Sequence, residues 1–268
     1  MIREILASAP LFLLLAARAL ALIETAPLLS SEANPQVARV ALAGFAAYAA
    51  FPSAQAIDTA GLELFSFSFI LLLIGEAIIG IIMGFFITMI FSAFSTAGQF
   101  FSLPMGFSAS ETFDPLSQTE NPLMGQYLNL VAMLVFLSLN GFNELFLGGF
   151  WRSVQSINVA ALASGREAVT GMLLAGLSRL FLDAMMISLP IMGTLFLTSL
   201  ATGLISKAAP QINILTEGFP ISITVAFMLI LATLPAMVEA FGRVINSGFS
   251  AVETLYIQIG RQITGGGI

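Results

Sequence analysis

The sequence predicts an all-α, integral membrane-type protein built from over-long apolar helices and helical hairpins. Of its 268 residues, 58% are hydrophobic and 9% are charged, and the mean hydropathy is +0.98. Soluble domains are about one quarter charged. Apolar runs of membrane-spanning length recur along the chain, separated by short polar stretches. In lipid, runs of this length satisfy their backbone groups as helices.

The composition also excludes several classes of function. The net charge is -6, with 9 basic and 15 acidic residues, so there is no basic surface for nucleic acid. The chain has no His and no Cys, on which zinc sites and most acid-base or nucleophilic catalysis rely. We therefore expect no catalytic residue, no metal and no cofactor, and we expect membrane lipid as a partner.

Two apolar segments open the chain. Residues 5–23 predict a first helix with Arg18 inside it. A secretory signal would look similar, because Ala17-Arg18-Ala19 resembles a cleavage site, but a charge inside or at the end of the apolar region favours an uncleaved helix. Residues 40–57 are rich in Ala and lie near the minimum length that spans hydrocarbon.

Residues 64–101 form the longest uninterrupted apolar run. Its roughly 38 residues would make about 57 Å of helix, nearly twice the hydrocarbon thickness, so we expect a long helix or a bent helix pair. Gly80 and Gly84 predict a face that packs closely against another helix.

The second half of the chain is also a series of apolar runs separated by polar stretches. Residues 123–150 form a further apolar run, with Asn140-Gly141 in its last third and Glu144 as its only charge. The run ends at an interfacial Trp151-Arg152 pair, and a polar connector over 153–167 follows. Residues 168–206 form a second over-long run, interrupted by Pro190. After a polar break at 207–218, we expect a helix over 219–238, framed by Pro220 and Pro235, and an amphipathic helix over 239–261 that leaves the hydrocarbon.

Between the two halves lies a polar island, residues 102–121. Its Pro and Gly residues predict a compact loop instead of a helix. Leu103, Met105, Phe107 and Phe113 nevertheless make it apolar in part. The apolar side chains of Met105, Phe107 and Phe113 need surroundings that exclude water, which a pore lumen, a subunit contact or ordinary packing would supply.

The isolated charged residues inside the apolar runs are the remaining candidate functional residues. Glu76 could be a proton relay, an anchor to a neighbouring subunit, or a residue in a wet interface above the membrane plane, and the last two are favoured. Arg179 and Asp183 are four residues apart on one helix face, where structural pairing is favoured over a proton path.

Several short motifs resemble the FliR family, the flagellar members of an export-gate family that also serves injectisome-type secretion. They occur in order along nearly the whole chain: Thr25-Ala26-Pro27, Thr96-Ala97-Gly98, Met105-Gly106, Asp114-Pro115, Leu139-Asn140-Gly141, Ala209-Pro210-Gln211-Ile212-Asn213 and Gly218-Phe219-Pro220.

The resemblance implies a non-enzymatic subunit of a flagellar type III secretion export gate in the bacterial inner membrane. It implies a helical hetero-oligomer with FliP-like and FliQ-like subunits, served by FlhA-like and FlhB-like components, that conducts unfolded proteins. Residues 1–190 would be approximately FliP-like and 191–268 approximately a FliQ-like hairpin. Leu103, Met105, Phe107 and Phe113 would plug the channel.

The principal alternative is a small-solute or proton transporter that acts alone. Such proteins gather several ionisable groups between broken helices. Glu76 and the Arg179 and Asp183 pair correspond only weakly to such a cluster. A second alternative is a membrane scaffold without a lumen.

Overall fold

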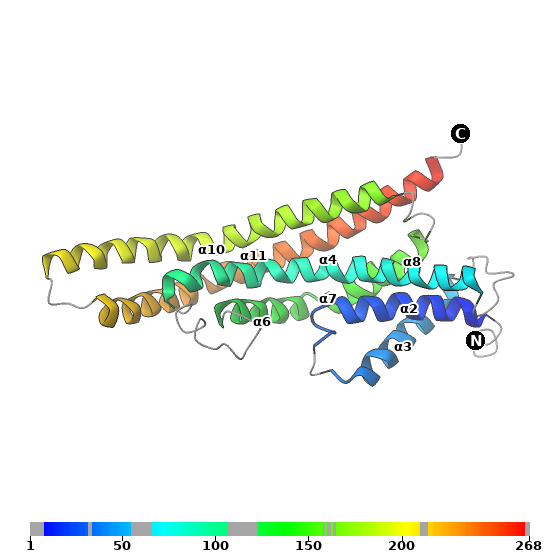
Figure 1. The fold of residues 1–268 in the computed structure, drawn as a ribbon, viewed down its shortest axis with the longest axis horizontal. Helices are drawn as coiled ribbons and strands as arrows, with labels where there is room; N and C mark the ends of the chain where they lie inside the picture. The colour runs from blue at the N-terminus through cyan, green and yellow to red at the C-terminus, as the bar shows by residue number, and fades with distance from the viewer. Residues whose placement is uncertain are drawn as a thin grey trace. The chain divides into compact units, whose positions relative to one another are not determined.

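The fold of the chain is all-helical wherever its structure is described (Figure 1). A computed structural model describes residues 8–31, 34–54, 66–106, 123–157, 159, 162, 165–209 and 214–265. The helices are α2 (Ala9–Thr25), α3 (Gln36–Ala54), α4 (Phe67–Met105), α6 (Leu123–Ser138), α7 (Gly141–Asn143), the π-helix η1 (Glu144–Trp151), α8 (Arg152–Ser156), α10 (Arg166–Ala208) and α11 (Ile214–Gly265). These ranges contain no strand, which confirms the predicted fold class.

The chain divides into two units, each assembled from separate segments. Unit 1 comprises Met1–Met89, Asn140–Gly176 and Asn246–Ile268, and unit 2 comprises Ile90–Leu139 and Leu177–Ile245. The long helices α4, α10 and α11 each contribute residues to both units.

In unit 1, α2 packs closely against both α3 and α4. The buried face of α3 is a row of Ala at helical spacing, which lets the α2 and α3 backbones approach. On α4, a Cβ added at Gly80 would lie 2.3 Å from the Arg18 carbonyl oxygen, and one at Gly84 would lie 2.9 Å from the Leu22 carbonyl oxygen. Only glycine fits at this separation.

Unit 2 is held by aromatic packing and a second close helix crossing. The Phe91 and Phe136 rings meet edge to face at 5.5 Å, and the Phe94 and Phe241 rings lie 4.4 Å apart. A Cβ at Gly98 of α4 would lie 2.5 Å from the Gly125 Cα of α6. Two glycines therefore bring these backbones into contact.

The predicted loop over 102–121 is wrong for its first four residues. Helix α4 continues through Pro104 to Met105, so the predicted run is one long helix. A proline in the last turn removes only one backbone donor, and the turn tolerates that loss. Gly106, at φ +90°, ends the helix, and its N–H donates to the Leu103 carbonyl oxygen at 3.0 Å.

The apolar run over 123–150 is not one straight helix, because the chain bends sharply inside it. Asn140 adopts a left-handed conformation with φ 55°, and the helices on either side meet at 78°. Asn accepts this conformation more readily than most residues. The chain continues as η1 and then α8, so the predicted connector at 153–167 is helical as far as Ser156.

The proline residues expected to interrupt the last helices lie inside them. Helix α10 runs through Pro190, and α11 is one helix through Pro220 and Pro235, where a break between two helices was predicted. In apolar surroundings, leaving the helix would expose several backbone groups, which costs more than the one bond that a proline removes.

Four helices in the described ranges are long and apolar enough to cross a membrane. They are Gln36–Ala54, Phe67–Met105, Arg166–Ala208 and Gly218–Gln258 within α11; a fifth span results if the bent pair Leu123–Ser138 and Gly141–Ser156 counts as one. The chain is an all-α membrane protein, as its composition predicts.

Candidate functional site

A buried ion pair connects three segments of unit 1. Arg18 of α2 is 2% exposed and Glu76 of α4 is 9% exposed. The Arg18 Nε donates to the Glu76 Oε2 at 2.5 Å, Nη1 donates to the Ser153 Oγ at 3.2 Å, and Nη2 donates to the Ile157 carbonyl oxygen at 2.9 Å. All three guanidinium nitrogens therefore have partners.

The close contact between α2 and α4 makes this pairing possible. Gly80 lies one helical turn after Glu76 and receives the backbone carbonyl of Arg18 itself. The hydroxyl of Ser153 both accepts from Arg18 and donates to the Phe150 carbonyl oxygen at 2.7 Å. The end of α8 is thereby fixed against the ion pair.

Glu76 thus has a partner in its own chain that none of its three sequence interpretations named. Charges inside apolar helices usually pair with one another, because the alternative is an uncompensated charge in a medium of low dielectric constant. A signal was present in the sequence: Arg18 and Glu76 are the lone opposite charges of the first and third apolar runs. Such a pair stabilises a structure and needs no chemistry of its own.

The second predicted pair lies in unit 2. The Arg179 Nε and the Asp183 Oδ2 are 3.8 Å apart on α10, with side chains 58% and 15% exposed. This contact is longer than a hydrogen bond and partly exposed to the surroundings of the protein, whereas the Arg18 and Glu76 pair is hydrogen-bonded and buried.

The residues predicted to plug a channel lie at the end of α4 or beyond it. Leu103 is 71% exposed, whereas Met105 is fully buried. Phe107 and Phe113 lie outside the described residues. A Cβ at Gly106 would lie 2.3 Å from Cδ1 of Phe219, so the end of α4 contacts the first turns of α11 within unit 2.

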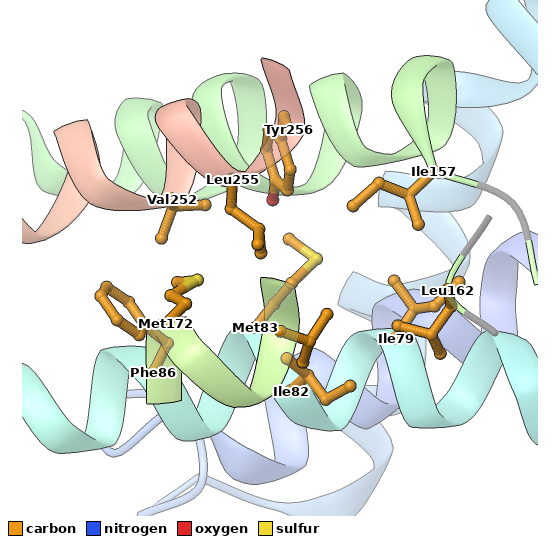
Figure 2. A pocket seen from close by; sticks show the side chains of 11 residues that line it. Ile79, Ile82, Met83, Phe86, Ile157, Leu162, Met172, Val252, Leu255 and Tyr256 are labelled. Carbon is orange, nitrogen blue, oxygen red and sulfur yellow. The ribbon is translucent and has the colours of Figure 1, made fainter. Parts of the chain in front are cut away.

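A small apolar pocket lies inside unit 1, between the first half of α4 and the ends of α10 and α11 (Figure 2). Its volume is about 20 Å³, and its walls include Met83, Phe86, Met172, Val252 and Leu255. That is room for one water molecule, but water in a cavity needs polar partners, and these side chains offer none. The Tyr256 hydroxyl, on the same wall, donates to the Gly149 carbonyl oxygen at 3.0 Å. This pocket is a packing defect and not a ligand site.

Nothing in the described part of the chain resembles a metal centre, since no three His, Cys, Asp or Glu side chains gather there. Large apolar side chains are instead exposed in numbers along α10. In unit 2 they include Leu177, Phe181, Leu182, Met185, Met186, Leu189, Phe196, Leu197, Leu200 and Leu204. An exposed apolar surface of this extent needs lipid or protein to cover it.

Comparison with known proteins shows the family. The model of bacterial export proteins, family 1, matches residues 9–248. The flagellar biosynthetic protein FliR of Escherichia coli is 34% identical over 81% of this chain and 82% of its own length. FliR of Bacillus subtilis is 30% identical over 94% and 96%. SpaR of Shigella sonnei, a surface presentation of antigens protein, is 26% identical over 59% of each chain. This chain therefore belongs to bacterial export protein family 1, the FliR family.

Proposed function

We propose that this protein is a subunit of the flagellar type III secretion export gate, where it forms a channel for unfolded flagellar proteins with FliP-like and FliQ-like subunits. The observation that carries the proposal is the family match over residues 9–248, with the FliR proteins of Escherichia coli and Bacillus subtilis aligned over most of their length. A role in flagellar or type III export follows from the family. The channel, its partners and its plug are the proposed part.

The exposed surface of α10 supports assembly with other subunits. Its exposed apolar side chains, including the pairs Phe181-Leu182, Met185-Met186 and Phe196-Leu197, lie on a different face of the helix from its buried apolar ones, such as Leu180, Ala184 and Ile187. A surface helix of a soluble protein has a single apolar stripe, which it buries. We infer that lipid covers part of this surface and that neighbouring FliP-like and FliQ-like subunits cover the rest.

The proposed mechanism is steric and needs no catalysis. Leu103, Met105, Phe107 and Phe113 would exclude water and ions from the channel at rest, because apolar constrictions dewet. The exposed side chain of Leu103 at the end of α4 is available for such a contact, whereas the buried Met105 would anchor the segment. Displacement of the segment would open the path.

We further propose the bacterial inner membrane at the flagellar basal body as the location, with FlhA-like and FlhB-like components as further partners. Residues 1–190 would correspond to a FliP-like part and 191–268 to a FliQ-like hairpin. Gly80 and Gly84 would be packing positions that hold the FliP-like part together, with Glu76 paired inside it.

Assembly tests the gate. The chain is co-expressed with FliP-like and FliQ-like proteins from the same genome, and the complex is extracted in detergent and weighed by native mass spectrometry. One copy of this chain beside several partner copies is the expected result. A monomer or homodimer that ignores these partners would refute the gate and favour the stand-alone transporter, which solute uptake into liposomes would then measure.

Conductance tests the plug separately. Replacing Phe107 and Phe113 with Gly should raise ion leak through the assembled complex in lipid bilayers, because the apolar barrier is removed. Phe67→Gly is the matched control, since Phe67 is a 77% exposed aromatic residue at the start of α4. Equal conductance of the double variant and the control would refute the plug.

A further inference from the structure

The described charged residues of this chain are almost all accounted for by ion pairs or by helix ends. Among the residues that the structure describes, five pairs form: Arg18–Glu76, Arg39–Glu24, Arg152–Glu253, Arg179–Asp183 and Arg243–Glu239. Arg166 and Glu167 lie at the start of α10 and Lys207 lies in its last turn. Helix ends are places where charges are readily solvated, and the helix dipole favours both Glu167 and Lys207 there.

Glu144 is the exception. It is the only charged residue between Leu123 and Trp151, in a helix pair apolar enough to span a membrane. Its carboxylate forms no hydrogen bond or ion pair with any residue that the structure describes. A carboxylate in such a segment is expected to pair with another group.

The Glu144 side chain lies in the wall of a polar cavity of unit 1. The cavity has a volume of about 230 Å³ and is partly open to the protein surface. Glu144, Gly148 and Arg152 line it from η1 and α8, and α11 contributes Asn246, Phe249, Ser250, Val252 and Glu253. Arg152 Nη1 donates to Glu253 Oε1, so this pair is neutral and the cavity keeps one net negative charge.

The backbone of η1 directs the carboxylate into this position. A Cβ added at Gly148 would lie 2.9 Å from the Glu144 Oε2, so the Glu144 side chain extends forward over this glycine, four residues further along the π-helix. π-helical turns are rare and are frequent at functional sites. The absent side chain of Gly148 leaves room for the carboxylate beside the cavity.

We propose that this cavity receives the side chain of a Lys or Arg residue from another subunit of the export apparatus, which pairs with Glu144. The charge of a Lys or Arg side chain fits the cavity, because one cation neutralises its net negative charge. The volume of the cavity also favours a single side chain over a small molecule, since 230 Å³ is below the usual range for small-molecule sites, about 300 to 1,000 Å³. The inference rests on the proposed function, because it requires assembly with other export subunits.

Charge variants of Glu144 in the co-expressed complex test the proposal. The fraction of complex that keeps its partners after a wash in about 0.5 M NaCl is measured for Glu144→Gln and Glu144→Lys by native mass spectrometry. We expect about threefold lower retention for Gln and about tenfold for Lys, since an interfacial charge loses its partner in the first and meets a like charge in the second. Glu167→Gln and Glu167→Lys are the matched controls, at an exposed glutamate of the same unit.

The outcomes separate the two proposals. If the unmodified chain assembles but Glu144→Lys retains partners within twofold of Glu167→Lys, the cavity proposal is overturned and the gate stands. If the unmodified chain does not assemble, both fall. Gly148→Ala should lower retention in the same direction, because it displaces the carboxylate without removing its charge, whereas Gly171→Ala, with nothing within 4 Å of the new Cβ, should not.

A photo-crosslinking residue at Phe249 identifies the occupant directly and does not depend on how the charge variants fold. The expected product is an adduct to another subunit, at a peptide that contains Lys or Arg. An adduct only to lipid or to this chain itself, or no protein adduct, would overturn the proposal.

Discussion

The buried pair of Arg18 and Glu76 allows a prediction whose size follows from its geometry. In Glu76→Gln the Arg18 guanidinium, 2% exposed, keeps its charge and loses the group that neutralises it. Removing one partner of a buried pair costs about 3 to 5 kcal/mol. An arginine cannot escape this cost by losing its proton, whereas a carboxyl group left alone can gain one. Glu76→Gln should therefore destabilise the protein more than Arg18→Met.

The double variant Arg18→Met with Glu76→Leu should recover most of the loss, because no charge remains buried. The assay is thermal unfolding in detergent, followed by the fluorescence of Trp151, the single tryptophan. At about 2 to 4 °C per kcal/mol for a chain of this size, Glu76→Gln should lower the midpoint by about 6 to 20 °C.

The pair of Arg39 and Glu24 is the internal control, with an Nη1 to Oε2 distance of 2.7 Å and a Glu24 side chain that is 37% exposed. Glu24→Gln should cost about 0 to 1 kcal/mol, since water already screens that carboxylate. Equal losses for Glu24→Gln and Glu76→Gln, or a double variant as unstable as the sum of its single changes, would refute the account of the buried pair.

Three further predictions concern packing and backbone, and each is measured by the same thermal assay. Gly80→Ala should cost about 1 to 3 kcal/mol, because the new Cβ would lie 2.3 Å from a backbone oxygen, whereas Gly44→Ala, with open space around it, should be neutral or stabilising; equal effects would refute the close crossing. Gly106→Ala should cost about 1 to 2 kcal/mol from its left-handed φ alone, so a neutral result would contradict that conformation. Val169→Ile should raise stability by up to about 1 kcal/mol by filling the apolar pocket, and a loss above about 1 kcal/mol would show that the space is already filled.

The existence and order of the helices could be predicted from hydropathy, because apolar runs of this length have few alternatives. The ends of helices could not. Pro104, Pro220 and Pro235 were expected to mark breaks and lie inside helices instead, where the apolar surroundings favour continued hydrogen bonding. At Asn140 the reverse occurs, since one left-handed residue turns the chain by 78° inside an uninterrupted apolar run.

The candidate site was predictable only in part. Glu76 stood out because it is alone in its run, but its pairing with Arg18 joins residues 58 positions apart, and periodicity carries no information about which helices are neighbours. Glu144 is the lone charge of the apolar run over 123–150, yet the cavity around it depends on α11, more than 100 positions away. Contacts of this kind require the tertiary structure.

The π-helix η1 determines the direction in which the side chains of the following helix α8 point. A π-turn holds more residues than the 3.6 of an α-turn, so η1 sets the angular phase at which α8 leaves it. Deleting one residue inside η1 would rotate Arg152 and Ser153 by about 100° around the helix axis and carry both away from Glu253 and Arg18. The hydroxyl of Tyr256, bonded to the Gly149 carbonyl oxygen inside η1, fixes that phase against α11. Chain length in this segment is thus under a stricter constraint than residue identity.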